Sequence, residues 1–214
     1  MDELLKNISV NTQSSIRIQC PDGPVIYSDP FQIREDSHDA DLVLITHDHY
    51  DHFDPDSIER VRKSTTVFIV PEKLKKETEK YASSKENLIA VQPGMSFEVS
   101  GIPVETVPAY NIGKPFHPRH AGWVGYILTI DGCRIYLAGD TDLTLEIQEI
   151  HCDIAMVPIG GTFTMDAEEA AKFINRIHPR AAIPIHYGSI VGKKSDAEVF
   201  RRGVDADVEV VVKL

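Results

Sequence analysis

The sequence is short of several features that mark specialised classes of protein. It has 3 cysteines in 214 residues, at Cys20, Cys133 and Cys152, and they form no C-x-x-C pair. An odd number of isolated cysteines fits neither a disulfide framework nor a zinc ribbon. We expect these thiols to serve as small, buried or half-buried apolar side chains.

Long apolar runs and positive charge are also scarce. No stretch approaches the roughly 18 apolar residues of a membrane span, and the start, MDELLKNISV, lacks the basic and then apolar pattern of a secretory signal. The 33 acidic and 22 basic side chains give a formal net charge of −11, which opposes a broad footprint for nucleic acid or anionic membrane. We predict a soluble, cytoplasmic protein with neither as a partner.

What is present is the composition of a globular chain. Hydrophobic residues make up 42% of the sequence, and no low-complexity segment or linker rich in Gly, Ser or Pro interrupts it. A chain of this length can bury a substantial core. We therefore predict a single domain over residues 1–214.

Short β-branched runs outnumber helical segments, and their order suggests two similar halves. The first half is predicted to contain strands at 14–20, 25–31, 41–46, 66–70, 87–91, 96–100 and 102–109, with helices at 56–63 and 71–82. The second half is predicted to contain strands at 123–130, 133–139, 153–159, 181–185 and 208–214, with helices at 165–177 and 196–203. Asp54 before Pro55, Asp166 before Glu169, and the turn Asp131–Gly132 are the clearest start and turn signals. This pattern predicts sheets covered by helices.

The segment ITHDHYDHFDP, residues 45–55, concentrates titratable side chains directly after the apolar run 42–45. An apolar run of this length is typical of a buried strand, so the polar residues would emerge at its carboxyl end, where α/β proteins place their chemistry. Imidazole and carboxylate are ligands for zinc-like ions. Because residues that alternate along an extended loop point in different directions, we expect this loop to serve two neighbouring metals. The four candidate ligands are His47, His49, Asp51 and His52.

The segment THDHYDHFD resembles the H-x-H-x-D-H signature of the metallo-β-lactamase superfamily, and YSDPF, AGDTD and PIHYG match later parts of the family pattern in order. Within the superfamily the chain is most similar to the branch of L-ascorbate 6-phosphate lactonase-like and related metal-dependent hydrolases, on VPAYN, GWVGY, PIGGTFTM and PIHYG. N-acylphosphatidylethanolamine phospholipase D is similar at a greater distance. The resemblance implies an α+β fold, a four-layer αββα sandwich in which two mixed sheets pack face to face with helices outside.

The resemblance also implies a ligand set. It assigns His47 and His49 to one metal and Asp51 and His52 to a second. Asp140 would bridge the two, and His186 would complete the second site. Many members carry a further histidine where this chain has Asn111, so the third nitrogen of the first site is expected from His117, with His120 as the alternative.

Two of these ligands also have support from the residues themselves, because Asp140 and His186 each follow an apolar run, as the loop at 47–52 does. Asp29 is interpreted as a buried carboxylate that orients a ligating imidazole. His38, His151 and His178 are expected to have no role in the site. Lys114, Arg119, Lys193 and Lys194 follow or flank ligands and are either substrate-binding cations or ordinary solvated ones.

Such a site would carry two divalent metal ions, with Zn²⁺ as the default and Mn²⁺, Fe²⁺ or Ni²⁺ as alternatives. Ions of this kind make hydroxide available near neutral pH and polarise the oxygen under attack. Besides Asp51, the candidate catalytic residues are possible proton donors to the leaving group, namely His120, Tyr187 and Tyr110.

The sequence thus predicts a dinuclear hydrolase in which a metal-bridging hydroxide attacks a small anionic substrate, either a sugar-phosphate lactone or a phosphodiester. A metal-dependent nuclease of the same superfamily and a metal-binding module without turnover are the alternatives. The absence of a basic stripe opposes the first alternative, and a ligand count that leaves room for water opposes the second. Homo-oligomerisation is left open.

Overall fold

The computed structural model describes residues 2–21 and 23–214. It divides into two compact units, Met1–Gln92 and Pro93–Leu214, here called the N-terminal and C-terminal units. Each unit holds one mixed sheet, of 6 and 7 strands respectively. In each sheet a run of antiparallel strands is followed by a run of parallel ones, as expected for two similar halves.

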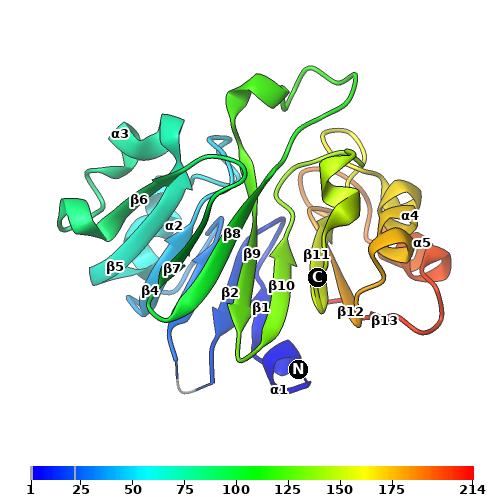
Figure 1. Ribbon diagram of the computed structural model, residues 1–214, viewed down its shortest axis with the longest axis horizontal. Coiled ribbons are helices and arrows are strands. Elements are labelled where there is room, and N and C mark those ends of the chain that lie inside the picture. The colour runs from blue at the N-terminus through cyan, green and yellow to red at the C-terminus, as the bar shows by residue number, and fades with distance from the viewer. Residues whose placement is uncertain (1, 22) are drawn as a thin grey trace. The chain divides into compact units, whose positions relative to one another are not determined.

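The sheet of the N-terminal unit has the order β1-β2-β3-β4-β5-β6 (Figure 1). The pairs β1–β2 and β2–β3 are antiparallel, and the remaining pairs are parallel. Helix α2 begins after Asp54, whose carboxylate accepts hydrogen bonds from the Asp56 amide and the Ser57 hydroxyl, as the sequence predicted. The elements are α1 (Asp2–Lys6), β1 (Ile8–Val10), β2 (Ile16–Gln19), β3 (Val25–Ser28), β4 (Ala40–Leu44), α2 (Pro55–Val61), β5 (Arg62–Pro71), η1 (Glu72–Leu74), α3 (Lys75–Thr78), η2 (Lys85–Asn87) and β6 (Leu88–Val91).

The sheet of the C-terminal unit has the order β13-β12-β11-β10-β9-β8-β7. Strands β9 and β10 form the predicted hairpin, and Asp131 and Gly132 both have positive φ at its two-residue turn. Helix α4 begins with the predicted capping box and buries its apolar face. The elements are β7 (Ser96–Val99), β8 (Ile102–Pro108), η3 (Arg119–Ala121), β9 (Val124–Ile130), β10 (Cys133–Leu137), η4 (Glu146–Glu149), β11 (Ile154–Pro158), α4 (Ala167–Ile177), β12 (Ala181–Ile185), α5 (Asp196–Gly203) and β13 (Glu209–Val210).

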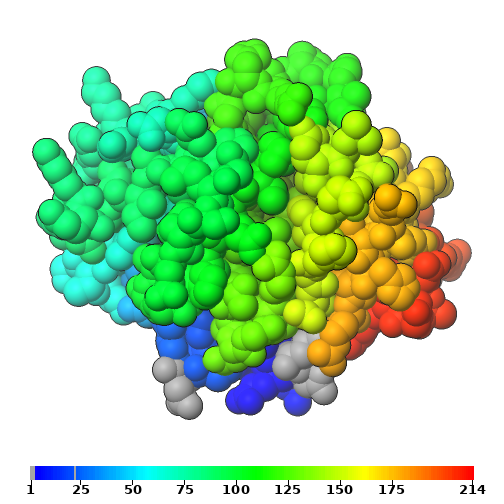
Figure 2. Space-filling model, viewed as in Figure 1, coloured from blue at the N-terminus to red at the C-terminus, as the bar shows by residue number. Residues whose placement is uncertain are grey.

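Two predicted elements are wrong in extent. The helix expected at 71–82 is only the single turns η1 and α3. The hydroxyl of Thr78 donates to the Leu74 carbonyl at 2.9 Å, and side-chain bonds of this kind compete with the helical ladder. The strand expected at 208–214 is only β13, because this edge strand pairs with β12 over just two residues. Helix α5 and the chain after it lie at the surface (red, Figure 2).

Each unit has its own hydrophobic core. In the N-terminal unit, buried side chains of β3, β4 and β5 pack with those of α2, among them Val43, Phe68 and Ile58. In the C-terminal unit, β10, β11 and β12 pack against α4 and α5 around Tyr136, Phe173 and Phe200. The parallel strands are packed into these cores, and the candidate ligands follow the carboxyl ends of those strands.

Candidate metal centre

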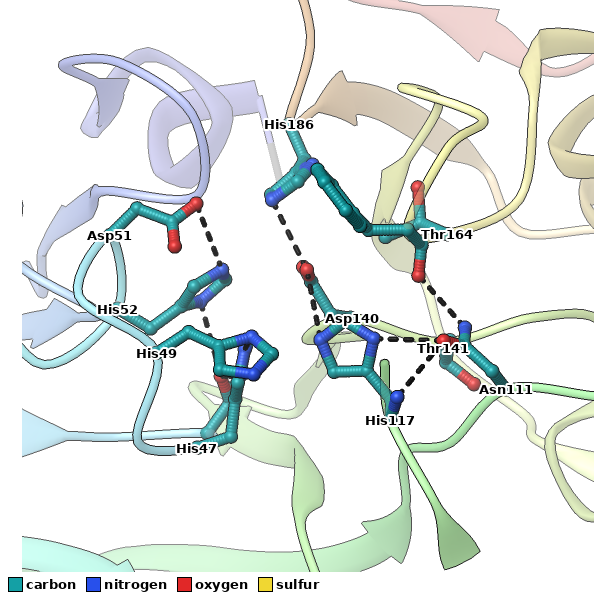
Figure 3. Close-up of polar contacts among 12 residues, drawn as sticks. His47, His49, Asp51, His52, Asn111, His117, Asp140, Thr141, Thr164 and His186 are labelled. Carbon is teal, nitrogen blue, oxygen red and sulfur yellow. Dashed lines mark hydrogen bonds and ion pairs between the residues drawn. The ribbon is translucent and has the colours of Figure 1, made fainter. Parts of the chain in front are cut away.

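The ligand loop of the N-terminal unit leaves the sheet at the end of β4 and runs to α2 (Figure 3). A tight turn in which the amides of His52 and Phe53 both donate to the His49 carbonyl reverses the chain. His47, Asp51 and His52 are buried, while the intervening Tyr50 is 66% exposed. The alternation of side chains along the loop therefore collects the predicted ligands on one side.

Asp29, at the end of the neighbouring parallel strand β3, holds this loop in place. Its Oδ1 accepts a hydrogen bond from the Thr46 amide at 2.8 Å, and its Oδ2 accepts from the Thr46 hydroxyl and from His52 Nδ1, both at 2.7 Å. Thr46 in turn accepts from His47 Nδ1 at 2.9 Å. One buried carboxylate thus orients two imidazoles, which supports the predicted role of Asp29.

Burial raises the pKa of the Asp29 carboxyl, whereas the hydrogen bonds from His52 and Thr46 lower it. Asp29 also has a φ of 46°, in the left-handed region that non-glycine residues rarely adopt. A strained, buried carboxylate that makes three hydrogen bonds is typical of a functional site.

The hydrogen bonds of His47 and His52 indicate which nitrogen of each ring can bind metal. When the Nδ1 atoms of neutral His47 and His52 donate to Thr46 and Asp29, their Nε2 atoms carry the lone pairs. His47 Nε2 lies 3.1 Å from His49 Nδ1, and His52 Nε2 lies 3.7 Å from Asp51 Oδ2. Two ligand atoms of a tetrahedral zinc ion are about 3.3 Å apart. The two pairs therefore have the spacing of atoms that share a metal.

In the C-terminal unit, His117 is held by a residue that the sequence marked only as a departure from the family pattern. Asn111 Oδ1 accepts from the His117 Nδ1 at 2.9 Å and from the His117 amide at 3.1 Å. The orientation of the Asn111 amide is settled by its Nδ2, which donates to the Phe163 carbonyl at 2.8 Å. His117 Nε2 therefore carries the lone pair, and it lies 3.4 Å from Asp140 Oδ2.

Asp140 and His186 follow β10 and β12, at the same edge of the C-terminal sheet. Asp140 Oδ2 lies 3.1 Å from His186 Nε2 as well as close to His117 (Figure 3). All three side chains are at most 3% exposed. His186 has a φ of 56°, and a Cβ at Gly160 would lie 2.4 Å from its carbonyl oxygen, so only glycine fits beside this ligand. Asp140 thus lies against both imidazoles of its own unit.

The two cations near His117 have partners of their own. Lys114 Nζ donates to Asp142 Oδ1 and to the Thr164 carbonyl, both at 2.7 Å, and to the Gly161 carbonyl at 3.3 Å. Arg119 pairs with Glu146 at 2.6 Å. The structure thus gives Lys114 the role of tying together three loops of the C-terminal unit, in place of the substrate-binding role considered from the sequence.

The neighbouring Glu146 also accepts a hydrogen bond from the Tyr110 hydroxyl at 2.8 Å. This bond lowers the pKa of Glu146, while burial and the same partner raise the pKa of Tyr110. The Tyr110 hydroxyl therefore already donates its proton in a hydrogen bond to Glu146.

The remaining candidates are placed differently. His120 is exposed in η3, whereas His117 is 1% exposed, which favours His117 as the ligand. Tyr187 belongs to the hydrophobic core, and burial raises the pKa of its phenol. His38, His151 and His178 are exposed, in line with the expectation that they stand outside the site.

Sequence reasoning missed the supports of the ligands more than the ligands themselves. The roles of Thr46 and Asn111 depend on hydrogen bonds that no local sequence pattern encodes. The sequence drew attention to Asn111 only because many members of the superfamily have a histidine at that position. Lys114 was noticed for its charge, yet its three acceptors come from segments distant in the chain.

Comparison with known proteins agrees with this picture. A family model described as the β-lactamase superfamily domain matches residues 7–186. The UPF0173 metal-dependent hydrolase of Methanopyrus kandleri is 36% identical over 192 residues, covering 83% of this chain and 80% of its own. The corresponding protein of Thermococcus kodakarensis is 34% identical over 197 residues, covering 84% and 81%.

Solved structures of related proteins are similar over nearly the whole chain. A structure from Parabacteroides distasonis, assigned as a metal-dependent hydrolase, has a TM-score of 0.80 at 31% identity and covers 97% of this chain and 92% of its own. Igni18, a metallo hydrolase of Ignicoccus hospitalis, has a TM-score of 0.79 at 26% identity, with coverage of 96% and 93%.

The chain belongs to the metallo-β-lactamase superfamily, and the predicted fold class is confirmed. Within the superfamily it is a member of the UPF0173 family of metal-dependent hydrolases. The described residues include clusters of His and Asp side chains able to hold metal ions. The lactonase-like branch and the identity of the metal stay predictions.

The described part of the chain contains no helix that is both long enough and apolar enough to cross a membrane.

Proposed function

We propose that the ligand loop of the N-terminal unit and the three ligands of the C-terminal unit surround two divalent metal ions, and that the two units act as one catalytic domain. His47, His49 and His117 would hold the first ion. Asp51, His52 and His186 would hold the second, with Asp140 between the two. Zinc suits this set of imidazoles and carboxylates best, and manganese, iron and nickel also accept it.

The observation that carries this proposal is that acceptor atoms face one another inside each unit. His117 Nε2 and the Asp140 carboxylate lie 3.4 Å apart, although the Nδ1 of His117 already donates to Asn111. The same holds for His52, which donates to Asp29 through Nδ1 and turns its Nε2 toward Asp51. With each ring neutral, the lone pairs at such a distance repel each other unless a cation, either a proton or a metal ion, lies between them. Neutral histidines and ionised carboxylates arranged in this way fit a metal ion.

When bound, the two ions supply a hydroxide nucleophile near neutral pH and polarise the carbonyl or phosphoryl oxygen that it attacks. The chain's own part is to bind and orient. Asp29 and Asn111 hold three ligating imidazoles in fixed tautomers. The centre remains net positive, because five of its seven ligands are neutral imidazoles. An anionic substrate is therefore favoured, either the lactone of a sugar phosphate or a phosphodiester.

Exposed apolar side chains stand on the loops that carry the ligands of the C-terminal unit. Ile112 is 58% exposed, Leu145 80% and Ile190 39%, and Phe116 makes an edge-to-face contact with Phe163 at 4.7 Å between ring centroids. Apolar surface beside a polar site favours substrates that have an apolar group next to the scissile bond. Aryl phosphodiesters and alkyl-substituted lactones are thus suitable probes.

The proton donor to the leaving group is the least constrained part of the proposal. His120 is exposed close to His117 in the chain and is the best placed of the three candidates. Tyr187 is a core residue, and the Tyr110 hydroxyl is engaged with Glu146. We therefore assign this role to His120, whereas Asp51 would help to hold the second metal.

The test is hydrolysis of bis(p-nitrophenyl) phosphate and of a panel of lactones by metal-loaded protein, with metal content measured by mass spectrometry. We expect two metal equivalents per chain and turnover that a chelator removes and metal restores. Two tightly bound metals without turnover of any ester, lactone or phosphodiester would favour a metal-binding module. A protein that retains no divalent metal would contradict the proposal.

A further inference from the structure

A second group of buried polar side chains lies in the turn between β1 and β2. The turn is closed by two backbone hydrogen bonds of 2.8 Å, from the Asn11 amide to the Ser15 carbonyl and from the Ser15 amide to the Thr12 carbonyl. Strand β2 begins immediately after it, and its first residue, Ile16, pairs with Ser28 at the end of β3. The turn therefore lies at the sheet edge from which Asp29 and the ligand loop emerge.

Hydrogen bonds attach this turn to the segment that supports the ligand loop. Ser15 Oγ accepts from the Phe31 amide at 3.0 Å, and Asn11 Nδ2 donates to the Phe31 carbonyl at 2.8 Å. Two residues earlier, Asp29 accepts from Thr46 of the ligand loop. The turn and the ligand loop are thus both attached by hydrogen bonds to the same short segment, residues 29–31.

Gln13, at the centre of the turn, has a buried side-chain amide with no hydrogen-bond partner among the described residues. It is 0% exposed and has a φ of 50°. Neither Nε2 nor Oε1 of Gln13, nor the hydroxyl of the adjacent Ser14, has a hydrogen-bond partner within residues 2–21 and 23–214. Buried amides and hydroxyls are nearly always paired, because an unpaired one loses its hydrogen bonds to water and gains none. Three such atoms in consecutive residues, on a strained backbone, indicate partners that come from a bound molecule.

We infer that Gln13 and Ser14 form a polar subsite that donates hydrogen bonds to an anionic oxygen of the substrate. The carboxamide offers two N–H donors and the hydroxyl one more, and a phosphate or carboxylate oxygen accepts such bonds strongly. The inference rests on the proposed function, since it places this subsite beside the proposed metal centre. Gln13 acts as a binding residue, and it takes no part in holding metal.

The matched control for Gln13 is Gln32. Both residues have φ near 50°, and both belong to the N-terminal unit, but the side chain of Gln32 is exposed. Replacement by methionine keeps the length of the side chain and its backbone constraints while it removes the amide. Gln13→Met and Gln32→Met therefore differ in a single respect, which is whether the lost amide was buried.

The experiment is calorimetric titration of metal-loaded protein with inorganic phosphate, together with metal analysis and thermal unfolding of each variant. We expect Gln13→Met to keep its metals and its unfolding temperature and to bind phosphate about 10- to 100-fold more weakly, the loss expected for a hydrogen bond to a charged group. Gln32→Met is expected to match the wild type in all three measurements. Ser14→Ala, which deletes only the hydroxyl, is expected to weaken phosphate binding and serves as the test should Gln13→Met not fold.

Equal phosphate affinity in wild type, Gln13→Met and Ser14→Ala would overturn the subsite. A marked drop in unfolding temperature for Gln13→Met with unchanged phosphate affinity would also overturn it, since that result assigns the amide to an internal water. Wild-type protein that holds two metals but binds no phosphate would reject the subsite and leave the proposed function standing. Wild-type protein without metal would reject the proposed function, and its phosphate titration would still compare Gln13 with Gln32.

Discussion

The two ligand sets of this hydrolase are assembled in different ways. In the N-terminal unit the four proposed ligands lie within residues 47–52 of one loop, and a single carboxylate, Asp29, orients two of them. In the C-terminal unit the proposed ligands His117, Asp140 and His186 come from three loops. Asn111 contacts His117, Gly160 lies against His186, and Lys114 contacts Asp142 in the loop of Asp140. A contiguous set can be positioned by one support, whereas a dispersed set needs several. Substitution of one orienting residue is therefore expected to affect more ligands in the N-terminal unit than in the C-terminal unit.

The largest effect is expected from Asp140→Ala. Asp140 lies within hydrogen-bonding or ion-pairing distance of two imidazoles of its unit, and in the proposed centre it joins both metals. We expect loss of both metal equivalents and of chelator-sensitive turnover, measured by mass spectrometry and by hydrolysis of an aryl phosphodiester. Retention of one full equivalent would show that Asp140 serves a single metal.

His52→Ala tests the contiguous set. It is expected to remove one metal equivalent and to lower activity on the order of 100-fold or more, since loss of a ligand exceeds the effect of losing a ligand's support. His38→Ala is the control, because that exposed side chain contacts the Arg62 carbonyl and has no proposed role in the site. If His52→Ala kept both metals and full turnover, the assignment of the second site would be wrong.

The choice between His117 and His120 tests the dispersed set. His117→Ala is expected to lose metal from the first site, while His120→Ala is expected to keep both metals and to lose activity only. The reason is that His117 is buried against Asn111 and Asp140, whereas His120 is exposed. Metal analysis of both variants decides, and loss of metal in His120→Ala alone would reverse the assignment.

The residues that orient the ligands, Asp29 and Asn111, should differ in the number of metal ions that they affect. Asp29→Asn and Asn111→Ala are each expected to weaken metal binding by about 10- to 100-fold, in competition with a chromophoric chelator. The effect of Asp29→Asn should include both metals, because Asp29 orients His52 directly and His47 through Thr46. Asn111→Ala should affect one metal, since Asn111 contacts only His117 among the ligands of its unit. If the two variants weakened the binding of the same number of metal ions, the proposed difference between the two units would be wrong.

The smallest effect is expected from Lys114→Met. It leaves the Asp142 carboxylate, whose side chain is 9% exposed, without its cation, so we expect a loss of about 1–2 kcal/mol in the free energy of unfolding. Metal content should not change. Lys193→Met is the matched control, because that lysine is exposed. Denaturant titration of both variants makes the comparison, and a loss of metal in Lys114→Met would show that the lysine supports the site directly.

Much of the fold could be read from local patterns. The hairpin turn at Asp131–Gly132, the cap at Asp54 and the capping box at Asp166 and Glu169 were predicted correctly, because each is decided by a few neighbouring residues. The helix at 71–82 and the strand at 208–214 were overestimated. Their extent depends on the Thr78 side chain and on the short pairing of β13 with β12, and propensity describes neither.

The sequence by itself determined the chemistry of this protein. A run of histidines and aspartates after a buried strand can be read as a metal loop, because its members are neighbours in the chain and the strand aims them at one edge. Only the tertiary structure decided which nitrogen of each histidine faces its partner ligand, since this choice depends on Asp29, Thr46 and Asn111. It also decided that Gln13 is buried with no hydrogen-bond partner among the described residues. Such contacts join residues far apart in the chain, and hydrogen bonds between them leave no periodic trace in a sequence.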